Sequence, residues 1–159
     1  MSVASMDLVK WHSSYLMHMP VVDHEHQDFF GFINRLHAAM LAGQGKDILE
    51  RLLEELLQYT FYHFAHEEEL MVAIKYPGLA AHAQGHNDLR RMVQTFVDRY
   101  QHGELAMTVE LTLFLSAWLK EHILTTDRTL GEYLHIHKII SSNRTEQLAR
   151  RKNVIRQAS

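Results

Sequence analysis

Metal-binding side chains recur one helical turn apart in the middle of this chain. His63 and Glu67 form one such pair, and His82 and His86 form another. A spacing of four residues places both members of a pair on the same face of a helix. Imidazole and carboxylate ligands without a thiolate suit iron, manganese or zinc, so the two pairs indicate a metal site.

Three further candidate ligands lie outside these pairs, on the inward faces of other expected helices. A single histidine on an apolar face is usually an ordinary core residue. Five imidazoles and two carboxylates at a similar depth would be costly to bury unless they coordinated cations. Carboxylates that bridge suit a two-metal site, and zinc alone would not normally need so many ligands. The candidate ligands are His26, His63, Glu67, His82, His86, His122 and Asp127.

Four amphipathic helices must position these ligands. Apolar residues recur at steps of three and four in four stretches of about 20 residues. Asp47, with Glu50 three residues later, resembles a capping box at the start of the second expected helix. With short connections, the pattern predicts an all-α, antiparallel up-down-up-down four-helix bundle with an irregular N-terminal arm and a C-terminal extension. The expected helices begin near Pro20, Asp47, Leu79 and Thr108.

The composition narrows the class of protein. A chain of 159 residues can bury one sizeable core, and its 13 histidines are far above normal use. With no cysteine, thiolate zinc sites, iron–sulfur clusters and disulfides are excluded. We find no signal peptide and no apolar run of about 18 residues, so we expect no membrane span and a cytoplasmic location.

The C-terminal segment differs from the rest in charge. Residues 138–159 carry six basic side chains and one acidic side chain, whereas the whole chain has a net charge of −3. We therefore expect a domain over 1–137 and a basic tail or linker over 138–159. The tail is a candidate contact for a protein partner or a fused signalling domain, and nucleic-acid binding is unlikely from its charge alone. The oligomeric state stays open.

Together these residues resemble the hemerythrin family, and the bacterial hemerythrins more closely. The resemblance covers roughly Trp11 to Leu134, and all seven iron-ligand positions of the family are filled by the expected residue types. The matching motifs are Asp23-His-Glu-His26, His63-Phe64, Glu67-Glu68, His82 with His86, and Trp118-Leu-Lys-Glu-His122-Ile123 with Asp127.

The resemblance implies a non-haem di-iron centre that binds dioxygen reversibly and is not an enzyme. One iron would take His82, His86 and His122, and the other would take His26 and His63. Glu67 and Asp127 would bridge the two irons together with an oxo or hydroxo group. Dioxygen would bind at the iron with fewer histidines. Apolar residues expected to line the oxygen pocket are Ile123, Trp118, Phe64, Phe30 and Leu119, although ordinary core packing explains most such residues equally well.

Two details depart from a regular pattern. The step of five from His122 to Asp127 rotates Asp127 by about 140° on a regular helix. We therefore predict a local π-type widening of the helix there. The family usually has glycine at the position of His18, seven residues after Trp11.

Other functions share parts of this pattern. A ferritin-like di-iron enzyme would need paired Glu-x-x-His motifs, and this chain has Glu132-x-x-His135 without a second copy in register. The same site in a redox enzyme acting on peroxide or nitric oxide is a second alternative. A sensor that signals through the tail is a third.

The eight remaining histidines are expected mainly at the surface or its boundary.

Overall fold

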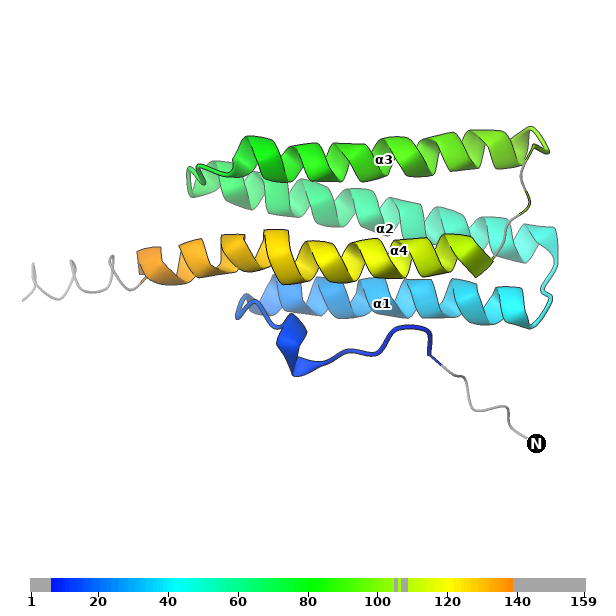
Figure 1. Ribbon diagram of the computed structural model, residues 1–159, viewed down its shortest axis with the longest axis horizontal. Helices are drawn as coiled ribbons and strands as arrows, with labels where there is room; N and C mark the ends of the chain where they lie inside the picture. Colours follow the sequence, from blue (N-terminus) through cyan, green and yellow to red (C-terminus); the bar gives the residue numbers. More distant parts are fainter. Residues whose placement is uncertain (1–6, 105, 107–108, 139–159) are drawn as a thin grey trace, which may run out of the picture.

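Four long helices run in alternating directions and form an antiparallel bundle (Figure 1). The computed structural model describes residues 7–104, 106 and 109–138. A short 3-10 turn, η1, spans Ser13–Tyr15, and α4 continues into a π-helix, η2, and then into helical residues 128–138. The described residues contain no strand, so the predicted all-α four-helix bundle is confirmed. The long helices are α1 (Pro20–Leu41), α2 (Lys46–Ala73), α3 (Leu79–Gln101) and α4 (Val109–His122), and η2 spans Ile123–Asp127.

Local sequence signals explain the helix starts only in part. Pro20 occupies the first turn of α1, where its missing N–H group costs nothing. The predicted capping box at Asp47 and Glu50 is wrong: α2 begins at Lys46, after Gly45, without a side-chain capping hydrogen bond. Asp47 still lies in the first turn, where its negative charge is favourable to the helix dipole. The predicted cap at Thr108 lies outside the described residues.

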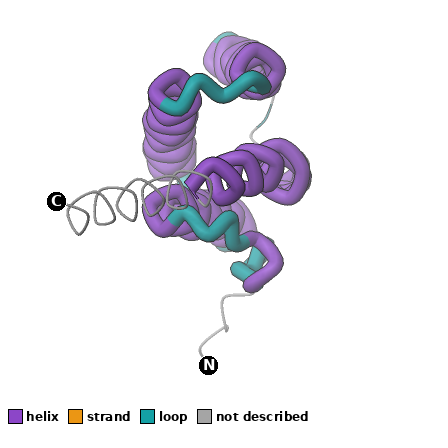
Figure 2. Tube along the Cα trace, turned by 90° about the vertical axis from the view of Figure 1, so that its left-hand side faces the viewer, coloured by secondary structure: helices purple, strands orange, loops and turns teal. Residues whose placement is uncertain are grey.

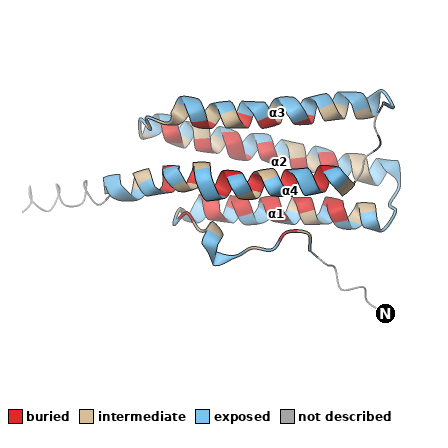
Figure 3. Ribbon diagram, in the orientation of Figure 1, coloured by how far each residue is buried: buried red, intermediate tan, exposed pale blue. Residues whose placement is uncertain are grey.

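The interior of the bundle has an apolar part and a polar part. Helix α1 packs against α2 and α4, and α3 packs against α2 (Figure 2). Buried residues recur along every long helix (Figure 3). Phe29, Ile33, Leu36 and Leu56 are almost inaccessible and belong to one hydrophobic cluster. Buried carboxylates and most buried histidines gather toward the α2–α3 connection, whereas His37 and Thr112 are buried together toward the opposite end.

The N-terminal arm is fixed against α1. Asn34 accepts a hydrogen bond from the Val9 N–H at 3.0 Å and donates one to the Val9 carbonyl at 2.8 Å. The Asp23 carboxylate accepts from the backbone N–H groups of Met17 and Met19, on either side of His18. His18 has a φ of 57°, a left-handed conformation that favours glycine. No described helix is long and apolar enough to cross a membrane.

Candidate metal centre

The structure brings all seven candidate ligands together in the interior of the bundle. Each is buried, and every long helix contributes at least one of them. Their ligand atoms form two groups, within each of which all the atoms lie within 4.8 Å of one another. We call these the three-histidine position (His82, His86 and His122) and the two-histidine position (His26 and His63); Glu67 and Asp127 belong to both.

The two carboxylates direct one oxygen toward each position. At the two-histidine position, His26 Nε2 lies 3.6 Å from Glu67 Oε1 and 3.2 Å from Asp127 Oδ2. At the three-histidine position, His82 Nε2 lies 3.4 Å from Glu67 Oε2 and 3.0 Å from Asp127 Oδ1. The opposite oxygens of the same carboxylates therefore face different sets of imidazoles. This arrangement suits carboxylates that bridge two cations.

Buried polar atoms without hydrogen-bond partners test whether metal ions fit this site. Among the described residues, both oxygens of Glu67 and of Asp127 have no such partner, and neither do the Nε2 atoms of His26, His63 and His82. Buried polar groups are normally hydrogen-bonded, because leaving them unpaired costs free energy. These atoms all converge on the two positions, so two cations would satisfy them.

The pKa shifts at the site show that a cation would compete with protons for these side chains. Burial alone would lower the pKa of His26, but the negative charges of Asp127 and Glu67 beside its imidazole raise it to about 10. The same opposing effects raise the pKa of His82 to about 9. Burial opposes ionisation of Glu67, yet the imidazoles around it, those of His63, His26 and His82, hold its pKa well below the usual range. Two anionic carboxylates at this depth attract either protons or metal ions.

The predicted widening of the last helix is confirmed. Ile123–Asp127 forms one turn of π-helix between α4 and residues 128–138. The wider turn lets Asp127 lie on the same side as His122, with Oδ1 at 3.2 Å from His122 Nε2. A regular α-helix would have directed this carboxylate away from the other ligands.

Two more carboxylates hold the outer nitrogens of ligand imidazoles. Glu68 Oε1 accepts from His86 Nδ1 at 2.9 Å, in keeping with its expected place outside the ligand set. Glu25, whose role sequence reasoning missed, accepts from His63 Nδ1 at 2.9 Å and from His66 Nδ1 at 2.8 Å. Such contacts fix the imidazole tautomer so that Nε2 faces the metal. The sequence did indicate that Glu25 faces the interior, because it lies four residues before Phe29 on the apolar stripe of that helix.

Aromatic and aliphatic side chains enclose the imidazoles. The Phe64 ring stacks on His86 with centroids 3.8 Å apart, and the Trp118 ring stacks on His122 at 4.5 Å. Of the other expected pocket residues, Ile123 and Leu119 are fully buried, whereas Phe30 packs edge-on against Trp11 and Tyr15 of the arm.

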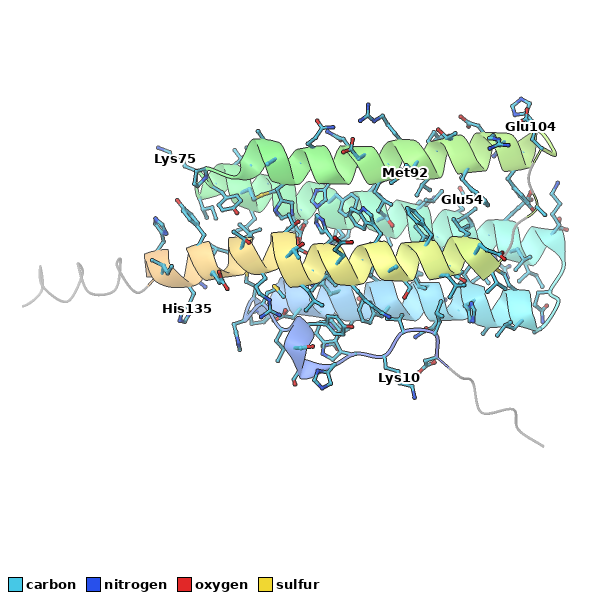
Figure 4. The ribbon with its side chains drawn as sticks, in the orientation of Figure 1. Lys10, Glu54, Lys75, Met92, Glu104 and His135 are labelled. Atoms are coloured by element: carbon cyan, nitrogen blue, oxygen red, sulfur yellow. The ribbon has the colours of Figure 1, made fainter. Side chains whose placement is uncertain are left out.

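The remaining histidines follow the expectation with one clear exception. His24 is exposed, as predicted from its position two residues before His26. His37 is buried instead, and its Nδ1 lies 2.8 Å from the Thr112 hydroxyl, which satisfies it inside the bundle. His135 is exposed and lies near the outer end of the last helical segment (Figure 4), so the Glu-x-x-His motif contributes nothing to the buried cluster.

Sequence comparison identifies the family. The profile of the hemerythrin HHE cation binding domain matches residues 18–134, most of the chain. The chain belongs to the hemerythrin family. Bacteriohemerythrin from Stenotrophomonas maltophilia is 33% identical over 132 residues, covering 83% of this chain and 85% of that protein. Hemerythrin from Themiste dyscrita is 30% identical over 117 residues, covering 74% of this chain and 86% of that protein.

Solved hemerythrin structures share the fold. A wild-type hemerythrin crystal structure superposes with a TM-score of 0.73 at 27% identity, covering 79% of this chain and 96% of that one. The crystal structure of a leucine-to-tyrosine mutant of hemerythrin superposes with a TM-score of 0.75 at 26% identity, covering 80% and 97%. Family membership therefore removes the ferritin-like alternative.

Proposed function

We propose that this hemerythrin-family protein binds dioxygen reversibly at a non-haem di-iron centre. The observation that carries the proposal is the pair of buried carboxylates that direct opposite oxygens to two sets of imidazoles. In this proposal one iron takes the three-histidine position and the other takes the two-histidine position. Glu67 and Asp127, which belong to both positions, would help to hold both irons. The two-histidine position has one histidine fewer, and dioxygen would bind on that side.

The protein's own groups prepare the site for this role. Two ferrous ions, when bound, supply the electrons that dioxygen binding requires. Glu25 and Glu68 keep the Nε2 atoms of His63 and His86 facing the metal positions. Phe64 and Ile123 are fully buried and help to exclude water and reductants. The oxygen pocket of Ile123, Trp118, Phe64, Phe30 and Leu119 remains a prediction.

A metal analysis combined with visible absorption spectra tests the proposal. The reduced protein is loaded anaerobically with iron and measured before exposure to air, after exposure and after degassing. We expect about two irons per chain, from the two groups of ligands, and an absorption band that appears in air and disappears on degassing. Iron that oxidises without a reversible band would favour a redox enzyme acting on peroxide or nitric oxide. A chain that retains no stoichiometric iron would refute the proposed centre.

The wider role rests on parts of the chain beyond the site. We propose that 1–137 form the di-iron unit and that 138–159 form a separate tail, through which a partner or signalling domain would act. Deleting 138–159 separates the roles, because a carrier or storage protein would keep its oxygen affinity and a sensor would lose its partner response. A cytoplasmic location is part of the proposal, and cell fractionation would test it.

A further inference from the structure

Arg90 lies one helical turn after His86 on α3 and reaches back over it. Its Nη1 donates to Glu68 Oε1 at 3.1 Å and to Asn87 Oδ1 at 2.8 Å. Its guanidinium carbon lies 5.2 Å from the centre of the Phe64 ring, within the range of a cation–π contact. The Arg90 side chain is only 25% exposed. It is therefore more constrained than a solvated surface arginine.

Two of the three groups that Arg90 contacts, Glu68 and Phe64, act directly on His86. Glu68 Oε1, which accepts from Arg90, also accepts from His86 Nδ1 at 2.9 Å. The Phe64 ring stacks on the His86 imidazole with an angle of 6° between the planes. Arg90 thus contacts the two neighbours that fix the orientation of this imidazole, without approaching the metal positions itself.

We propose that Arg90 is a positioning residue that secures His86 at the three-histidine position. The inference rests on the proposed metal centre. A guanidinium is always charged, so its hydrogen bond holds the Glu68 carboxylate in place. A carboxylate held there strengthens the hydrogen bond from His86 Nδ1, which directs Nε2 to the metal.

The two metal positions differ in this respect. The carboxylate behind His63 is Glu25, and its second contact is the imidazole of His66, whose side chain is 36% exposed. Glu68 instead has a permanent cation as its second contact. We therefore infer that the three-histidine position releases its metal more slowly, and that Arg90 accounts for part of the difference. The ordinary alternative is a surface ion pair that stabilises α2 against α3 and nothing more.

Release of cobalt to a chelator tests this inference without any need for oxygen chemistry. The full-length protein is loaded anaerobically with Co²⁺, mixed with excess EDTA, and followed through the visible absorption of bound Co²⁺. We expect two phases. Arg90→Gln should accelerate the slower phase by about 3–10-fold, less than the roughly 10–100-fold effects found for direct partners of metal ligands. Arg91→Gln is the matched control, because Arg91 is exposed and pairs with Asp88. It should release Co²⁺ as the wild type does.

A double-mutant cycle with Glu68→Gln separates positioning from mere packing. If Arg90 acts through Glu68, Arg90→Gln should have little further effect once Glu68→Gln is present. An undiminished effect in that background would overturn the proposed route. Arg90→Met keeps an apolar stem over Phe64 and removes the charge, so it should accelerate release as Arg90→Gln does. Wild-type release by Arg90→Met would equally overturn the inference.

The outcomes for the two proposals are distinguishable. Wild-type protein that fails to bind two Co²⁺ ions would count against the metal centre itself. Wild-type protein that binds two ions and releases them at the same rates as Arg90→Gln would refute only the role of Arg90. Urea unfolding of each loaded variant identifies any acceleration that comes from loss of folding rather than from the site.

Discussion

Raising the pH by one unit above about pH 7 should strengthen the binding of a pair of divalent ions by about 100-fold. The reason is that His26 and His82 hold protons at neutral pH, with pKa values of about 10 and about 9. Each of the two cations must displace one of these protons before the Nε2 atom at its own position can coordinate it. Burial lowers the pKa of His86, so this ligand has no proton to displace in that range.

The magnitude follows from the number of displaced protons. Each proton contributes about tenfold per pH unit, or about 1.4 kcal/mol, so two contribute about 2.7 kcal/mol. Above about pH 9, the lower of the two pKa values, the dependence should fall to about tenfold per unit, because only His26 still holds a proton, and it should end near pH 10. Had both imidazoles kept their ordinary pKa of 6.5, binding would be nearly independent of pH above neutrality.

The assay is competition for Co²⁺ between the protein and a chelator whose own pH dependence is known. His26→Gln should reduce the slope to about tenfold per pH unit, because one proton-binding group is removed. His24→Gln is the control, since His24 is exposed and should leave the slope unchanged. A wild-type affinity that stays constant from about pH 7 to about pH 8.5 would refute the reasoning.

Four further outcomes are expected. Glu25→Gln should weaken metal binding by about 10–100-fold in the same competition assay, because the Nδ1 of His63 loses its anionic partner; unchanged affinity would exclude that role. Leu56→Ala should cost about 2–5 kcal/mol in urea unfolding of the loaded protein, since Leu56 is 1% exposed in the core; a loss below about 1 kcal/mol would contradict tight packing there. His18→Gly should stabilise the protein by up to about 1 kcal/mol in the same unfolding assay, because His18 has a positive φ. Destabilisation would show that contacts of the His18 side chain outweigh the relief of backbone strain. In metal-free protein the raised pKa of His26 stabilises the fold fully below pH 6.5, and this stabilisation is lost as the pH rises toward about 10. The melting temperature should therefore fall over that range, and a melting temperature that rises would contradict the prediction.

Local patterns in the chain were enough to predict the helices and to select seven side chains that the bundle brings together. Periodic apolar residues and pairs at a spacing of four depend only on the geometry of a single helix, so both can be read without knowing which helices are neighbours. The irregular step from His122 to Asp127 also predicted the π-helix, because a regular turn could not bring both side chains to one side. The capping box at Asp47 failed since Gly45 precedes the helix instead, and a local motif only states a preference.

Contacts between helices depend on packing that no single segment encodes. Glu25 reaches His63 from α1 to α2, and Glu68 reaches His86 from α2 to α3, so these partners are far apart in the chain. His37 was expected near the surface, yet the approach of α4 buries it beside Thr112. The opposite oxygens of Glu67 face two metal positions only once all four helices have assembled. Residue types and spacing therefore indicate which side chains can bind metal, whereas the packed bundle decides which ones meet and which groups hold them in place.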